Sequence, residues 1–283
     1  SFIGRERNLL EETPEHCRML KLPHPVLTSE DITRIRQADN PDIKCAELKM
    51  LFPAEDGAEG LQKALDQMCE KAEQEITDGA SILILSDSDM DRDYVPIPSL
   101  LAAAGLHHHL IRKGLRASAG IILETGEARE VIHFAMLIAY GVNAVCPYLA
   151  LESVRELAEQ KPADTELTAD VAIDHYIAAV KKGLLKTLSR MGISTIRSFC
   201  GSQIFEAVGL NRKVVDKYFS GTTTRIEGSG LEELAREAIE RHSKAFPEYQ
   251  QPAEILDVGG NYNLRAQGEK HLWTQNNLPL FQR

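Results

Sequence analysis

Residues 81–86 of the chain read Ser81-Ile82-Leu83-Ile84-Leu85-Ser86. An apolar residue at every inner position, instead of every second one, is typical of a strand buried on both faces of a parallel sheet. A polar loop at 87–93 follows this run, and residues 99–113 have the composition of a helix. The stretch therefore predicts the first β-loop-α unit of an α/β fold.

The same alternation recurs twice further along the chain. A second apolar run at 119–123 precedes a polar loop and a helix expected over 128–140. A third short strand is expected at 144–147, with a helix over 152–160 after it. Three successive units of this kind favour parallel strands joined by right-handed crossovers. We predict an α/β protein with a parallel sheet of βαβ units.

Apolar spacing predicts more elements on either side of these units. Helices are expected over 61–76, 173–188, 203–208, 214–219 and 231–246. Residues 194–199 are expected to form a fourth strand, and residues 161–164, 221–224 and 228–230 to form a linker and loops.

The pattern also predicts a division into three parts. Residues 1–58 are rich in proline and turn residues and are expected to form an extended N-terminal arm. Residues 59–246 are expected to form the α/β central domain, and residues 247–283 a C-terminal linker.

Composition excludes several classes of function. The chain has 32 Lys+Arg and 42 Asp+Glu among 283 residues, a formal charge of −10, which argues against nucleic-acid or anionic-membrane binding. No apolar stretch approaches the ~20 residues that span a bilayer. We expect a soluble, cytoplasmic chain cut from a longer one. The five cysteines form no C-x-x-C pair and fit no disulfide framework.

Candidate sites lie in the loops that follow the predicted strands. Residues 86–93 are rich in carboxylates, and residues 124–130 combine acidic, hydroxyl and cationic groups that could form a polar site or simply cap a helix. Gly201 is expected to begin a helix that could bind an anion. His107, His108 and His109 point about 100° apart on a helix and cannot converge on one metal ion. The residues alone give no complete active site.

Several long motifs occur in order over nearly the whole chain. They are Phe2-Ile3-Gly4-Arg5-Glu6-Arg7-Asn8-Leu9-Leu10, Val95-Pro96-Ile97-Pro98-Ser99-Leu100-Leu101, His107-His108-His109-Leu110-Ile111-Arg112, Glu124-Thr125-Gly126-Glu127-Ala128-Arg129-Glu130 and Gly201-Ser202-Gln203-Ile204-Phe205-Glu206. The first is similar to the segment that follows the amidotransferase domain in the glutamate synthase large chain, and the others resemble the central domain of that family.

The resemblance implies a fold, a function and partners. Members make two glutamates from glutamine and 2-oxoglutarate, using an amidotransferase domain and a barrel domain that holds FMN and an Fe–S cluster. The central domain joins the two, helps to line an ammonia tunnel, and is a rudimentary, incomplete TIM-barrel-like relative of the FMN barrel. Its partners are those two domains of the same polypeptide and, through the full enzyme, a small NADPH-oxidising subunit.

The resemblance also implies that this chain lacks the chemistry of its neighbours. It begins at Ser1 instead of the nucleophilic cysteine, and the cysteine motif of the Fe–S cluster is absent. We therefore expect no cofactor in this chain, no catalytic or metal-binding residue, and no glutamate synthesis by the chain in isolation.

Three functions remain open at this stage. A conduit for ammonia could be lined by the hydroxyls of Thr28 and Thr125, which donate and accept hydrogen bonds, although both residues equally suit caps or turns. A freestanding flavin- or phosphate-binding enzyme would use the loop at Gly201. A purely structural spacer would need no lined path.

Overall fold

A computed structural model describes residues 2–38, 40, 42–160, 167–247, 259–260, 263–274 and 277–281. The chain divides into two compact units, Ser1–Phe246 and Pro247–Arg283, which are described separately. The linker predicted at 161–164 lies outside the described residues. In the second unit, helix α10 (Leu278–Phe281) follows a turn in which the Glu269 N–H donates to the Gly259 carbonyl oxygen at 2.9 Å.

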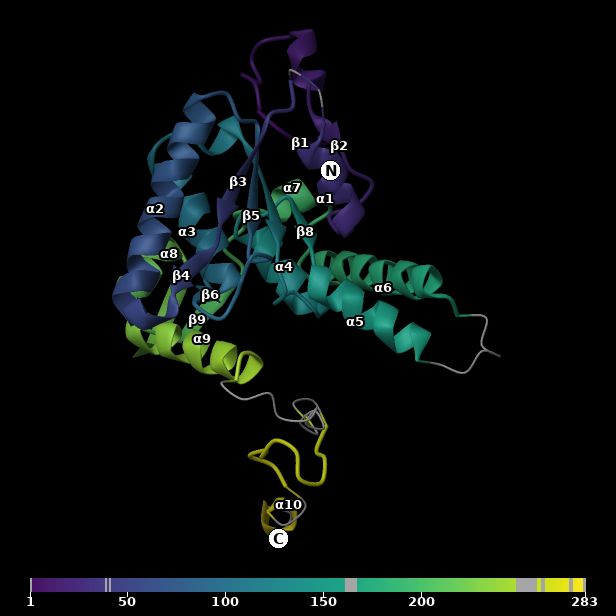
Figure 1. The fold of residues 1–283 in the computed structure, drawn as a ribbon, viewed down its shortest axis with the longest axis vertical. Helices are drawn as coiled ribbons and strands as arrows, with labels where there is room; N and C mark the ends of the chain where they lie inside the picture. The colour runs from purple at the N-terminus through teal and green to yellow at the C-terminus, as the bar shows by residue number, and fades with distance from the viewer. Residues whose placement is uncertain are drawn as a thin grey trace. The chain divides into compact units, whose positions relative to one another are not determined.

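A four-stranded parallel sheet forms the centre of the first unit (Figure 1). Its strands lie in the order β3 (Cys45–Lys49), β5 (Ile82–Ser86), β7 (Gly120–Glu124) and β8 (Ala144–Cys146). Every residue of β5, β7 and β8 is buried. The α/β prediction and the two-sided burial of the apolar runs are confirmed. In the part of the chain that the structure describes, the sheet does not close into a barrel.

Helices cover one face of this sheet. The crossovers are α2 (Gly57–Thr77), α3 (Ser99–Arg112) and α4 (Val131–Ala139), which connect consecutive strands. The larger core packs Leu83, Leu85, Ile121, Leu123 and Val145 of the strands against these helices. Because side chains alternate along a strand, this face takes every second residue of each apolar run.

The N-terminal segment covers the opposite face. Residues of β1 (Phe2–Ile3), of helix α1 (Ser29–Arg36) and of the chain between them form a second core with the strand residues Ile82, Ile84, Ile122, Ala144 and Cys146. The Leu27 N–H donates to the Val145 carbonyl oxygen at 2.8 Å and ties this segment to β8. The segment also forms β2 (Leu20–Lys21) and the short 3-10 helix Pro14–Cys17.

Strand β3 was missed by the sequence analysis, which treats residues 1–58 as irregular. The strand lies at the edge of the sheet, and only Ala46 and Leu48 in it are buried. Buried and partly exposed residues therefore alternate along its five positions, and no continuous apolar run marks the strand. Next to it, β4 (Leu51–Pro53) pairs antiparallel with β6 (Tyr94–Pro96), and the short 3-10 helices Ala54–Asp56 and Arg116–Ser118 complete the connections.

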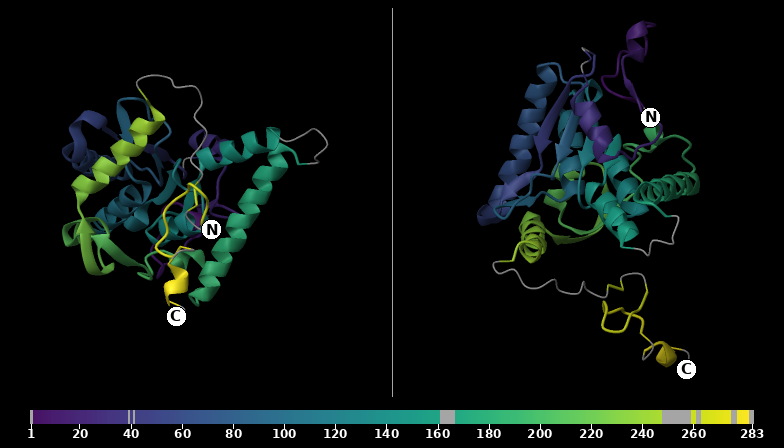
Figure 2. Two further views of the ribbon diagram at one scale, coloured as in Figure 1. Left: turned by 90° about the horizontal axis from the view of Figure 1, so that it is seen from below. Right: turned by 45° about the vertical axis from the view of Figure 1, so that its right-hand side comes forward.

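The rest of the first unit is helical with one small sheet. Helices α5 (Tyr148–Glu159) and α6 (Ala169–Arg190) pack on each other and extend away from the parallel sheet (Figure 2). After α7 (Ile196–Phe199), β9 (Glu206–Leu210) pairs in parallel with β10 (Thr223–Ser229). Helix α8 (Arg212–Tyr218) connects them, and α9 (Leu231–Ala245) follows.

Three predictions in this region were wrong. Residues 194–199 do not form a strand, because the Thr195 hydroxyl oxygen accepts the Ser198 N–H at 3.2 Å and caps the short helix α7. The helix expected over 203–208 overlaps β9, and the expected loops at 221–224 and 228–230 overlap β10. Most residues of this strand pair are partly exposed, so no buried apolar run marks them. None of the described helices is long and apolar enough to cross a membrane.

Gly120 provides a test of how the N-terminal segment packs on the sheet. A Cβ atom at this position would overlap Ile3 Cγ2 and lie 3.1 Å from the Gly4 nitrogen. The substitution Gly120→Ala is therefore expected to destabilise the protein by about 1–3 kcal/mol through overpacking, as measured by chemical denaturation. The double variant with Ile3→Ala removes the overlap, so its loss should be smaller than the sum of the two single losses. Additive losses would contradict this packing.

Candidate functional site at the carboxyl edge of the parallel sheet

The carboxyl ends of the parallel strands bring the two polar loops together. Ser86 pairs with Glu124 in the register of β5 and β7, and Glu124 pairs with Cys146 of β8. Side chains that follow these strands therefore meet at one edge, which is where open α/β sheets place their ligand sites. Two buried polar clusters form there, one on each face of the sheet.

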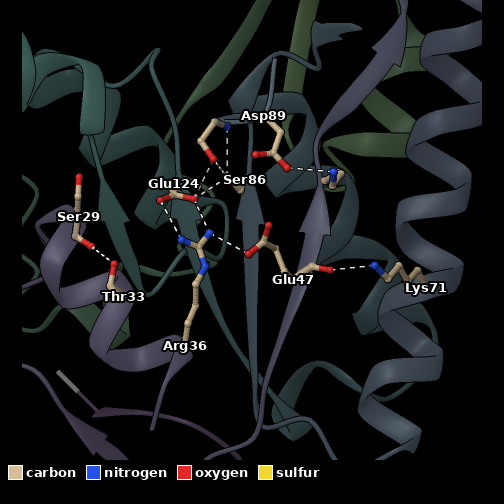
Figure 3. Close-up of polar contacts among 10 residues, drawn as sticks. Ser29, Thr33, Arg36, Glu47, Lys71, Ser86, Asp89 and Glu124 are labelled. Carbon is tan, nitrogen blue, oxygen red and sulfur yellow. Dashed lines mark hydrogen bonds and ion pairs between the residues drawn. The ribbon is translucent and has the colours of Figure 1, made fainter. Parts of the chain in front are cut away.

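The first cluster lies on the face that the N-terminal segment covers (Figure 3). Arg36, in the last turn of α1, donates from Nη1 and Nη2 to the two carboxylate oxygens of Glu124 at 3.4 and 2.7 Å. The same guanidinium pairs with Glu47 of β3 at 2.8 Å, and the Ser86 hydroxyl donates to Glu124 at 2.5 Å. This bidentate ion pair offsets the cost of removing the Glu124 carboxylate from water.

Electrostatics makes Arg36 the centre of this cluster. Burial lowers the pKa of Arg36, but the hydrogen bond and charge of Glu124, together with those of Glu47, raise it above the ordinary value. The guanidinium is thus held charged between two carboxylates and joins α1 to the sheet. The sequence analysis missed Arg36. It lies 88 residues from Glu124, and its only signal was a basic residue at the end of a short helix.

The second cluster lies on the helix-covered face and is built around Asp87. The Thr125 hydroxyl donates to Asp87 Oδ2 at 2.6 Å, and the Gly126 N–H donates to Asp87 Oδ1 at 3.1 Å. A hydrogen bond also joins the Thr125 and Ser99 hydroxyls at 2.6 Å. Burial raises the pKa of Asp87 to about 6, against the hydrogen bonds from Thr125, Tyr148 and Gly126, which lower it.

The structure gives each proposed tunnel residue a local partner. Thr28 is the N-cap of α1: its hydroxyl oxygen accepts the Asp31 N–H at 3.1 Å, and Asp31 accepts the Thr28 N–H at 3.0 Å. Thr125 belongs to the Asp87 cluster, and its hydroxyl oxygen also accepts the Glu127 N–H at 3.1 Å. Both residues flank the end of β8, but no hydrogen bond joins them. Lining of a path by these residues stays a prediction.

The side chains of the histidine run do not converge on one point. His107 Nδ1 accepts from Arg116 Nε at 2.9 Å, whereas His109 Nε2 lies 2.6 Å from Glu73 Oε1, so the two side chains have separate partners. Burial and the charge of Arg116 lower the pKa of His107 to about 3. Among the described residues, no group of three or more His, Cys, Asp or Glu could hold a metal ion.

Gly201 does not begin a helix, contrary to the prediction. It follows α7 in a left-handed conformation with φ of 72°, and its N–H donates to the Ala139 carbonyl oxygen at 2.8 Å. The next regular element is the strand β9. The anion site expected at a helix N-terminus therefore has no helix to form it.

Comparison with known families decides the assignment. The family model described as "Glutamate synthase central domain" matches residues 1–211. The chain belongs to this family. A glutamate synthase (NADPH) large chain of Bacillus subtilis is 39% identical over 282 residues, which is 100% of this chain and 18% of the relative. A ferredoxin-dependent glutamate synthase of Pyropia yezoensis is 40% identical over 280 residues, 95% of this chain and 18% of the relative.

A third relative is also matched over only a small share of its length. The glutamate synthase (NADH) of Schizosaccharomyces pombe is 37% identical over 275 residues, 96% of this central domain and 13% of the relative. The chain thus spans less than a fifth of the length of these curated relatives. Among solved structures, a flavocytochrome b2 variant with benzoylformate has a TM-score of 0.41 at 12% identity, covering 66% of this chain and 46% of that one.

Proposed function

We propose that this chain is the connecting domain of a glutamate synthase. It joins an amidotransferase domain to an FMN-binding synthase domain of the same polypeptide and helps to line the path of ammonia between them. The observation that carries the proposal is the match of nearly the whole chain to a small part of long glutamate synthases. A small NADPH-oxidising subunit and a cytoplasmic location stay predictions.

The packing of the sheet supports a connecting role over a role as a separate enzyme. The N-terminal segment fills the face of the sheet that would be the interior of a closed barrel, with Ile3, Ile32 and Ile35 among its buried residues. At the carboxyl edge, the Arg36 guanidinium is already bound by Glu47 and Glu124. A phosphate group could bind Arg36 only by displacing these carboxylates, which disfavours a flavin- or phosphate-binding site at this cluster.

The positions of the two threonines support a path along this edge. The Leu27 N–H, next to Thr28, donates to the Val145 carbonyl oxygen at 2.8 Å. The Thr125 N–H donates to the Cys146 carbonyl oxygen at 3.0 Å. Both threonines therefore flank the same end of β8. Ammonia donates and accepts hydrogen bonds as a hydroxyl does, so hydroxyls can pass it along without charging it.

The test is the coupling of the two reactions in the intact enzyme. Thr125→Val and Thr28→Val are expected to lower the glutamate formed per glutamine hydrolysed, because ammonia escapes where a hydroxyl no longer guides it. The serine variants keep the hydroxyl and should restore the ratio. Thr33→Val is the matched control, since Thr33 is an exposed residue of α1 whose hydroxyl donates to the Ser29 carbonyl oxygen within the helix.

Two readouts distinguish loss of ammonia transfer from loss of folding or of the synthase site. Synthesis driven by added ammonia should be unchanged in the valine variants, because the synthase site is intact. An unchanged coupling ratio in both valine variants would exclude these residues from the path and leave the spacer as the better account.

A further inference from the structure

A pocket of about 200 Å³ opens beside the carboxyl edge, and neither the fold nor the proposed function uses it. It lies between the start of α3, the loop after β7, α4 and α9. Ser99, Glu127, Arg129, His133 and Arg241 provide its polar lining, next to apolar residues such as Leu137. Two of these five side chains, Arg129 and Arg241, are cationic, in a chain whose formal charge is −10.

The hydrogen bonds at the start of α4 leave one ring nitrogen of His133, Nε2, as a hydrogen-bond donor. Its Nδ1 accepts the backbone N–H groups of Arg129 and Glu130, each at 3.2 Å, at the start of α4. A neutral imidazole whose Nδ1 accepts hydrogen bonds carries its proton on Nε2. The ring atom left over for a ligand is therefore an N–H donor.

The two arginines extend this donor set. The Arg129 guanidinium makes no hydrogen bond or ion pair with any residue that the structure describes. Arg241 of α9 pairs with Glu127 at 3.3 Å. The second oxygen of Glu127 accepts the Ser99 N–H at the start of α3, at 2.7 Å, so this carboxylate is already occupied. The lining thus offers donors and positive charge to a ligand.

We propose that this pocket binds a small carboxylate anion. A carboxylate accepts two hydrogen bonds from one guanidinium in a planar fork, and Arg129 is open to this contact. Arg241 and the His133 N–H provide further donors. The volume equals about seven waters of ~30 Å³ each, which suits a short-chain mono- or dicarboxylate. The Glu127 carboxylate, which accepts the Ser99 N–H and pairs with Arg241, already shows a carboxylate bound by donors of these kinds.

The test uses arginine modification in the intact protein that carries this chain. Phenylglyoxal reacts with accessible guanidinium groups, and peptide mass spectrometry gives the rate at each arginine. Glutarate is the probe, at constant ionic strength. At a concentration ten times Kd, the modification of Arg129 and Arg241 should slow by about tenfold. Arg155 of α5, which pairs with Glu152 at 3.6 Å on the surface, should be unaffected.

Variants separate a bound ligand from general screening. Arg129→Gln should abolish the glutarate protection of Arg241, whereas Arg155→Gln should leave it unchanged, with circular dichroism confirming that both variants fold. No slowing at Arg129, or equal slowing at Arg155, would overturn the site. Equal protection by inorganic phosphate would overturn the assignment to carboxylates. Because none of these readouts measures glutamate synthesis, they stand apart from the test of the proposed function.

Discussion

Arg36→Met is expected to lower the free energy of unfolding by about 3 kcal/mol. The variant leaves the buried Glu124 carboxylate without its cation, a change that typically costs about 3–5 kcal/mol in buried pairs. The lower end applies because one third of the Arg36 side chain is exposed, whereas only 7% of the Glu124 side chain is. Urea denaturation of the variant and of the parent protein measures the difference.

Arg34 provides the matched control on the same helix. Its side chain is 74% exposed and pairs with Glu30 one turn away at 3.5 Å, so Arg34→Met should cost less than about 1 kcal/mol. Adding Glu124→Gln to Arg36→Met removes the uncompensated charge and should recover part of the loss. Equal effects of the Arg34 and Arg36 variants would show that the Arg36 contact does not join the N-terminal segment to the sheet.

Asp87 is expected to make the protein less stable as pH rises from about 4 to about 6. The unfolded chain releases this proton near the ordinary pKa of 3.8, but the folded chain holds it until about 6. The folded state therefore binds more protons in this window, and its stability falls as the carboxyl ionises. At ~1.4 kcal/mol per pKa unit, the contribution of Asp87 is about 3 kcal/mol, and it is constant above the window.

Comparison with Asp87→Asn isolates this contribution. The free energy of unfolding of the parent protein relative to the variant should fall by about 2 kcal/mol between pH 4 and pH 7, measured by urea denaturation at each pH. Asp89→Asn is the control, because Asp89 is an exposed residue of the same loop that pairs with Lys49 at 2.9 Å. It should keep the parent pH profile. A constant difference for Asp87→Asn would contradict the buried, proton-retaining carboxyl.

The apolar runs were sufficient to predict the centre of the fold. A short, continuous apolar run of this length is typical of a strand buried on both faces. The strands predicted at 81–86, 119–123 and 144–147 therefore lie close to their bounds in the structure. Strand β3 was missed because one side of an edge strand stays polar. At 194–199, the β-branched residues suggested a strand, but local capping by Thr195 produced a helical turn instead.

The candidate site was predictable only in part. The sequence placed the two polar loops, 86–93 and 124–130, after predicted strands, where α/β folds have their sites, but it did not bring the two loops together. The partner of Glu124 could not be found in the same way, because Arg36 reaches it from a segment whose path over the sheet depends on packing. The motif at 124–130 does adjoin a helix start, but the N-cap of α4 is Glu130 and not Thr125 or Glu127, the two capping residues expected from the sequence.

A connecting domain that joins other sites needs no cofactor of its own. Visible absorption of the purified chain, recorded after FMN is added and unbound flavin is removed by desalting, tests this role. Cooperative urea unfolding must first establish that the chain is folded. We expect a folded, colourless protein. A folded chain that retains one flavin per molecule would contradict the connecting role and favour a flavin-binding enzyme.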